Sequence, residues 1–154
     1  GTIEFDSATL YRYATVNVDG LRHNLADDEA TVRALEAFLR SFATSMPTGK
    51  QNTFANRTAP DAVLVQARTD RPVNLVGAFE EAVPASGGYL QGSAARLAEH
   101  AADVDRAFGT APEASWVTVV GRKTAALGAL GSGLPFDQLV SVVGEHVRGA
   151  LGQA

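Results

Sequence analysis

A short polar segment in the middle of the chain has the residue types that bind phosphate. Residues 48–53 read Thr-Gly-Lys-Gln-Asn-Thr, so hydroxyls, amides and one cation surround Gly49. The wider stretch 37–60 contains Arg40, Lys50 and Arg57 and no acidic residue. Backbone N–H groups, neutral side-chain donors and a positive charge can together hold a phosphate group. An ordinary polar surface loop that has no acidic residue is the alternative at this point.

Two tyrosines near the start of the sequence offer a second type of contact. Tyr11 and Tyr13 alternate with other residues in a stretch that has the pattern of a strand. Aromatic residues on one face of a strand can stack on nucleic-acid bases. More often, such tyrosines cover a core and keep their hydroxyls in water. We interpret both as mainly structural and leave base stacking open.

The histidines and glycines form no known catalytic pattern. His23, His100 and His146 are far apart, and none lies in an HExxH motif. We expect His100 and His146 to be solvated on the polar sides of helices. The glycine-rich residues 128–133 match no nucleotide-binding loop and no hydrolase nucleophile motif. Because cysteine is absent, thiol chemistry is excluded as well. We predict a protein that is not an enzyme, with no catalytic residues and no cofactor.

The one acidic cluster has a structural explanation. Asp27, Asp28 and Glu29 are consecutive and precede a helical pattern. Acidic side chains at the start of a helix accept hydrogen bonds from free backbone N–H groups and complement the helix dipole. We assign Asp27 or Asp28 to helix capping and predict no metal site.

Length and composition indicate one globular domain over residues 1–154. The chain is 45% hydrophobic and 19% charged, with a net charge of −4 and a pI of about 5.3. An acidic chain binds nucleic acid only through a local basic patch. No apolar run approaches the ~18 residues of a membrane span. We therefore expect no membrane contact and a cytoplasmic location.

Hydrophobic spacing predicts the elements that must position these residues. The predicted strands are Thr9–Asp19, Ala62–Arg68 and Ser115–Val120. The predicted helices are Thr31–Ser45, Leu75–Val83 (favoured over a strand), Tyr89–Phe108 and one with Pro135 in its first turn. Met46–Pro60 and Thr124–Gly133 are predicted loops. This order favours an α+β fold in which the three strands share a small sheet and the Thr31–Ser45 helix packs on it.

Four motifs in consecutive order resemble the CasC family, the backbone subunits of the type I-E CRISPR surveillance complex Cascade. They are GTIEF followed by LYRYATVNVDGLRHNL, then MPTGKQNTFANRTAPD, VNLVGAFEEAV and GGYL. Together they run from Gly1 to about Leu90. Members of that family are longer, and this chain is similar to their C-terminal portion.

The resemblance implies the C-terminal part of an RNA-recognition-motif-like (ferredoxin-like) palm, with helices packed on a small antiparallel sheet. In that interpretation, residues 1–8 end the inserted thumb, and residues 9–154 form the palm and C-terminal helices. Because the rest of the palm is not in this sequence, we expect a sheet edge or an apolar face to be left open.

The resemblance also implies a function in antiviral defence. In the CasC family, copies assemble head to tail along the spacer of a CRISPR RNA (crRNA) and present it for pairing with target DNA. The partners implied here are crRNA, target DNA through the guide, further copies of the chain and other Cascade subunits. The matching RNA-contact residues are Gly49, Lys50, Gln51, Asn52 and Thr53, with weaker candidates at Arg57 and, as thumb contacts, at Thr2 and Phe5.

Two other functional classes stay open on the sequence. One is a small α/β enzyme that binds a ligand with the loop 128–133. The other is a protein-interaction domain that does not bind RNA. Nucleic acid that co-purifies with the protein after washing in moderate salt distinguishes both from the RNA-binding prediction.

Overall fold

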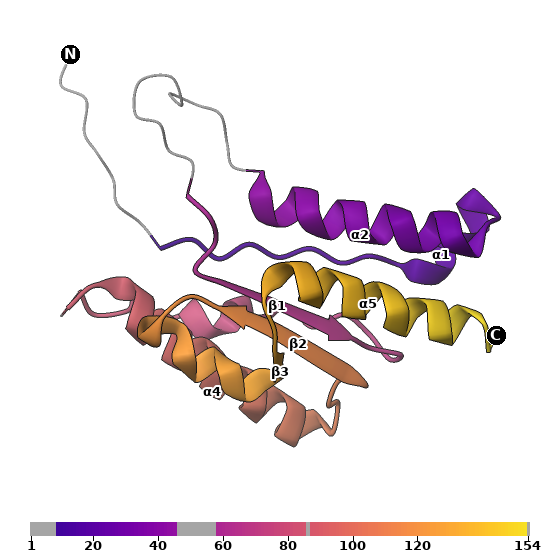
Figure 1. Ribbon diagram of the computed structural model, residues 1–154. Helices are drawn as coiled ribbons and strands as arrows, with labels where there is room; N and C mark the ends of the chain where they lie inside the picture. Colours follow the sequence, from indigo (N-terminus) through magenta and orange to yellow (C-terminus); the bar gives the residue numbers. More distant parts are fainter. Residues whose placement is uncertain (1–8, 46–57, 86, 154) are drawn as a thin grey trace, which may run out of the picture.

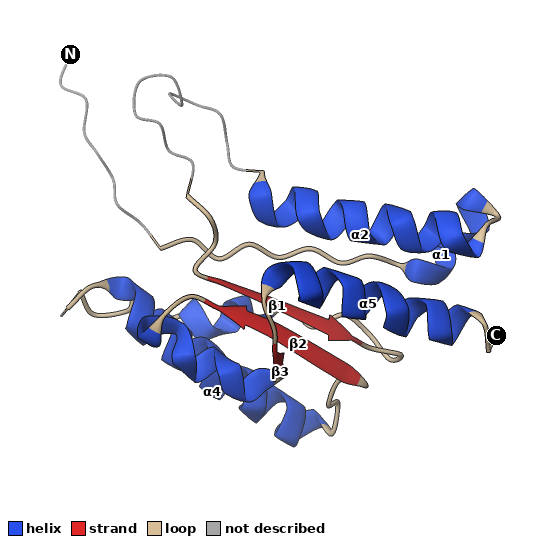
Figure 2. Ribbon diagram, viewed as in Figure 1, coloured by secondary structure: helices blue, strands red, loops and turns tan. Residues whose placement is uncertain are grey.

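The computed structural model describes residues 9–45, 58–85 and 87–153, and its elements lie in three layers. In chain order the elements are α1 (Val18–Leu25), α2 (Asp28–Thr44), β1 (Ala62–Ala67), the 3-10 helix η1 (Leu75–Phe79), α4 (Tyr89–Phe108), β2 (Ala114–Val119), the 3-10 helix η2 (Arg122–Leu130), β3 (Ser132–Gly133) and α5 (Phe136–Leu151). The sheet is the middle layer, with α2 and α5 on one side and α4 and η2 on the other (Figure 1 and Figure 2). The predicted α+β class is confirmed.

The sheet is small and mixed. β1 and β2 pair antiparallel from Ala62 opposite Val119 to Ala67 opposite Ala114. β3 pairs parallel to β2, so the implied all-antiparallel sheet is correct for one of the two strand pairs. β3 passes close to β2 because residue 131 is glycine: a Cβ there would lie 2.6 Å from the carbonyl carbon of Ser115. Among the described residues, β1 has a strand partner on one side only, which agrees with the expected open edge.

Alternation along β2 divides the core between the two faces of the sheet. The buried Trp116 faces α2 and α5, and the fully buried Val117 faces α4 and η2. Successive side chains of a strand point to opposite faces, so one strand supplies both cores. The first cluster also contains Val32, Leu35, Leu139, Val140, Val143, Val147 and Leu151, and the second contains Ala94 and Leu127.

The first predicted strand is wrong. Residues 9–17 pair with no strand in the described part of the chain, and the predicted strand's last residues belong to α1. Asn17 caps this helix by accepting a hydrogen bond from the Gly20 backbone N–H at 2.9 Å. Val16 and Val18 pack against the core cluster around Trp116. The apolar alternation is therefore used for packing, whereas a strand also needs the hydrogen bonds of a neighbouring strand.

The helix predicted at Thr31–Ser45 is α2, which begins earlier. Its N-cap is Asp27, whose carboxylate accepts a hydrogen bond from the Ala30 backbone N–H at 2.6 Å. α2 packs directly on α5. It meets the sheet through the core that Val32 and Leu35 share with Trp116. The predicted packing on the sheet is thus realised through a common core, with α5 beside it.

The second half of the chain follows the predicted order with two corrections. α4 has the predicted bounds, and the strands Ala62–Arg68 and Ser115–Val120 differ from β1 and β2 by one residue at their ends. The predicted loop Thr124–Gly133 is wrong, because η2 and β3 occupy it. Pro135 is the N-cap of α5 rather than a residue of its first turn.

The helix predicted over Leu75–Val83 is present as the shorter η1. None of the described helices is both long and apolar enough to cross a membrane.

Candidate nucleic-acid interface

All the RNA-contact residues predicted from the sequence lie outside the described residues: Gly49, Lys50, Gln51, Asn52, Thr53, Arg57, Thr2 and Phe5. The described chain on either side of these segments defines where they attach. It begins at Thr9, ends at Ser45 after α2, and resumes at Thr58 before β1. The geometry of the candidate interface is built on these flanking residues.

Arg12 joins two of these flanks. Its Nη1 donates a hydrogen bond to the carbonyl of Ser45 at 2.7 Å. Its guanidinium carbon lies 4.4 Å from the centre of the Phe42 ring, and Phe42 stacks on Phe38 at 5.7 Å. A cation at a helix C-terminus satisfies a free carbonyl and complements the helix dipole. Arg12 therefore holds the segment 9–17 against the end of α2, close to where both undescribed segments attach.

The flank before β1 is fixed to the end of β2. The backbone carbonyl of Asp61 accepts a hydrogen bond from the backbone N–H of Val120 at 2.9 Å. Figure 1 shows the same arrangement, with the start of β1 lying beside the tip of the β2 arrow. The first residues of η2, Arg122 and Lys123, follow shortly after Val120. Two cations that the sequence interpretation did not single out thus lie at the return of the predicted phosphate-binding loop.

Tyr11 is structural, as predicted. Its hydroxyl donates to Asn74 Oδ1 and accepts from the Leu75 backbone N–H, each at 3.2 Å. Its ring lies 5.6 Å from that of Phe79, and burial raises the pKa of the Tyr11 phenol. Tyr13 is 38% exposed, so its ring is accessible. Base stacking by Tyr13 stays an open alternative to the structural interpretation.

The arginines of the described chain differ in whether they have an acidic partner. Six of them form ion pairs: Arg22, Arg40, Arg68, Arg96, Arg106 and Arg148. Arg122 and Lys123 are exposed and form no ion pair with any described residue. The sequence signal for them is two consecutive cations after a turn glycine, which is weak because such pairs are common on surfaces.

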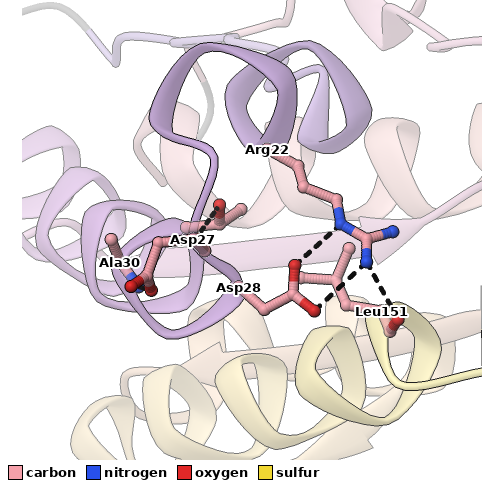
Figure 3. Close-up of polar contacts among 6 residues, drawn as sticks. Arg22, Asp27, Asp28, Ala30 and Leu151 are labelled. Atoms are coloured by element: carbon pink, nitrogen blue, oxygen red, sulfur yellow. Dashed lines mark hydrogen bonds and ion pairs between the residues drawn. The ribbon is translucent and has the colours of Figure 1, made fainter.

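The acidic cluster is used for structure, as Figure 3 shows. Asp27 caps α2, and Asp28 binds Arg22 through two hydrogen bonds of 2.7 and 3.2 Å. Arg22 also reaches the carbonyl of Leu151 at 3.5 Å, which ties α1 to the end of α5. Glu29 pairs with Arg148 at 2.7 Å, and this hydrogen bond lowers the pKa of the Glu29 carboxyl. Within the described ranges, no three His, Asp or Glu side chains are arranged to hold a metal ion.

The expectation of solvated histidines is wrong for His100 and His146. Both are half-buried. The His146 ring packs edge-on against Trp116 with centroids 5.1 Å apart, and its Nε2 lies 3.7 Å from Glu113 Oε1. His100 packs against η1, where a Cβ on Gly77 would lie 3.1 Å from its Nε2. The sequence missed both because a helical face shows polarity but not which neighbour covers it.

Comparisons with known proteins place these features in a family context. A family model described as CT1975-like protein matches residues 1–141. A chain of a structure titled "CRISPR RNA-guided surveillance complex, pre-nicking" is 31% identical with a TM-score of 0.78, over 86% of this chain and 36% of that one. A chain of another, titled "CRISPR RNA-guided surveillance complex", is 32% identical with a TM-score of 0.74, over 83% of this chain and 50% of that one.

The chain thus spans between about a third and a half of the length of these two relatives. No curated protein matches it.

Proposed function

This chain belongs to the CT1975-like protein family of Cas proteins, and we propose that it is a component of a CRISPR RNA-guided surveillance complex that binds the guide RNA. The observation that carries the proposal is the similarity in both sequence and fold to chains of such complexes. In the finer form of the proposal, the protein is a non-catalytic type I-E backbone subunit. Copies of it line up head to tail along the crRNA.

A local phosphate-binding surface accounts for RNA binding by an acidic chain. The net charge is −4, but residues 37–60 contain no acid and carry Lys50 and Arg57 besides Arg40, which is paired with Asp137. Contacts to phosphate and ribose carry no base information, so one subunit can bind any guide sequence. That indifference is what a complex with interchangeable guides requires.

In the enzyme alternative, the glycine-rich stretch 128–133 would bind a ligand. In the structure, this stretch packs against β2 and pairs with it. Ser115 Oγ donates to the Leu130 carbonyl at 2.6 Å, and Gly131 lies against the Ser115 backbone. β3 adds the next two residues to the sheet. These contacts favour the RNA-binding proposal over a ligand site at this stretch.

Lys50→Ala in the full-length protein tests the proposal. We expect guide RNA to bind roughly threefold to fivefold more weakly, because one phosphate contact is lost. The slope of log affinity against log salt should fall by about 0.7, the value for one single-strand contact. Fluorescence titrations with two unrelated RNAs should show the same loss for both. Gly49→Val should do at least as much harm without a change in charge, because the loop is distorted.

Arg106→Ala is the matched control, because it removes one exposed cation from the far end of α4. It should leave RNA affinity and salt slope unchanged. If Lys50→Ala has the same RNA affinity and the same salt slope as the wild type, RNA binding by this loop is contradicted. A full-length protein that binds no RNA at all would contradict the proposal and favour a protein-interaction domain.

A further inference from the structure

The turn between β2 and η2 presents two neighbouring cations to solvent. Arg122 and Lys123 follow Gly121, whose φ of 69° makes the turn that separates them from the strand. Both side chains are exposed, and neither forms an ion pair within the described ranges. By contrast, Arg68 is almost completely covered and bound to Asp105. A guanidinium and an ammonium without carboxylate partners are available for an anionic ligand.

A buried threonine holds this turn in place. The Thr124 hydroxyl accepts a hydrogen bond from the Val120 N–H at 3.1 Å and donates to the Val120 carbonyl at 3.0 Å. Thr124 is 1% exposed, so this contact is sealed from water. The Val120 N–H also donates to the Asp61 carbonyl at 2.9 Å. The turn that carries the two cations is therefore held by hydrogen bonds to Thr124 of η2 and to Asp61, the residue before β1.

This turn also lies beside the residues at which the described chain resumes before β1. Asp61 follows Thr58, the first described residue after the predicted loop, by three residues, which at full extension span at most about 11 Å of chain. Asp61 is the neighbouring acid, and it forms no ion pair with Arg122 or Lys123. Arg122 and Lys123 thus lie near the described residues that follow the predicted loop in the sequence.

We propose that Arg122 and Lys123 form a second phosphate-binding site for the same guide RNA strand, in addition to the predicted loop 49–53. The ligand is the sugar–phosphate backbone, which the two side chains contact without reading bases. The proposal rests on the RNA-binding function proposed above and adds residues to that function.

The test is the double variant Arg122→Ala, Lys123→Ala in the full-length protein. We expect about fivefold to tenfold weaker binding of single-stranded RNA, equally for two unrelated sequences. The salt slope should fall by up to about 1.4, which is twice the single-strand value for one contact. Fluorescence titration at several salt concentrations measures both quantities. Thermal unfolding should be unchanged, because both side chains are exposed.

Two control variants test whether the effect depends on the position of the two cations and on their charge. Arg71→Ala with Arg106→Ala removes the same charge from the opposite end of the sheet and should leave RNA affinity unchanged. Arg122→Lys with Lys123→Arg keeps both charges and should keep the salt slope. A loss of affinity in either control as large as in the double alanine variant would overturn the proposal.

The remaining outcomes distinguish this proposal from the one it rests on. If Lys50→Ala weakens RNA binding and the double alanine variant does not, the second site is wrong and the RNA-binding function stands. If neither changes RNA affinity, both proposals fail. A loss that occurs only with an RNA–DNA duplex would assign the two cations to target DNA and overturn the assignment to the guide strand.

Discussion

At the end of the sheet where β1 stops and β2 begins, an arginine is enclosed by its partners. The Arg68 side chain is 7% exposed, and its Nη2 donates to Asp105 Oδ1 at 2.8 Å. Its Nη1 donates to the carbonyl of Thr110. Arg106, on the same helix as Asp105, pairs with Asp103. Arg68 and Arg106 at this end thus have acidic partners within the protein.

At the opposite end, where β1 starts and β2 stops, Arg122 and Lys123 have no such partners in the described part of the chain. The backbone there is held by Thr124 and Asp61, so the turn is ordered without using its cations. A charge that is buried and paired contributes to folding, whereas an exposed, unpaired one is available to a ligand. The comparison predicts that stability and RNA binding respond to mutations at different ends of one sheet.

Removal of Arg68 should have the largest effect on stability. Arg68→Ala leaves the Asp105 carboxylate, which is 22% exposed, without its partner. Breaking a buried pair from one side costs about 3 kcal/mol. We expect that loss in the free energy of unfolding, measured with urea. The RNA affinity of the folded fraction should not change.

The control for this prediction replaces both partners. Arg68→Met with Asp105→Leu should recover most of the stability, because no unpaired charge remains. Arg106→Ala, at an exposed pair, should change the free energy of unfolding by no more than about 0.5 kcal/mol. If Arg68→Ala lowers the free energy of unfolding by no more than Arg106→Ala does, the stability of this end of the sheet does not depend on its buried pair.

Thr124→Val should have a smaller effect on stability and also weaken RNA binding. The variant loses both hydrogen bonds between the hydroxyl and the backbone of Val120. We expect a cost of about 1 kcal/mol, since Val120 N–H keeps its bond to Asp61. RNA binding should weaken although no charge is removed, because the Thr124 hydroxyl no longer holds the turn that carries Arg122 and Lys123. Urea unfolding and fluorescence titration together check this, with Thr124→Ser as the variant that restores both.

The smallest effect concerns the exposed pair of Glu29 and Arg148, which joins α2 to α5. The hydrogen bond from Arg148 lowers the pKa of Glu29 below its ordinary value of 4.5. The pair therefore stabilises the fold above about pH 4.5, and this contribution is lost as the pH falls through the pKa of Glu29 in the folded protein. Arg148→Met should raise that pKa toward 4.5, as measured by NMR titration of the carboxyl group. Arg33→Met, which removes a lesser charge effect, should raise it less.

The candidate site was predicted from the sequence in part. An acid-free stretch around Lys50 is visible in the residue types alone, and the family resemblance assigned it to RNA contact. The position of Arg122 and Lys123 near Asp61 was not visible, because it depends on the pairing of β1 with β2. The anchoring of Ser45 by Arg12 was equally hidden, since thirty-three positions separate the two residues in the chain.

The sequence by itself determined the elements whose signals are local. The helix at Tyr89–Phe108, the strands near Ala62 and Ser115, and a helix cap at Asp27 or Asp28 follow from spacing and residue type over a few positions. The tertiary structure decided the elements that depend on a partner from a distant part of the chain. Residues 9–17 have an alternating pattern but no strand beside them in the described chain, whereas Ser132 and Gly133 have a weak pattern and pair with β2. A helix forms its hydrogen bonds within itself, but a strand forms them with another part of the chain, and only the fold decides whether that part is there.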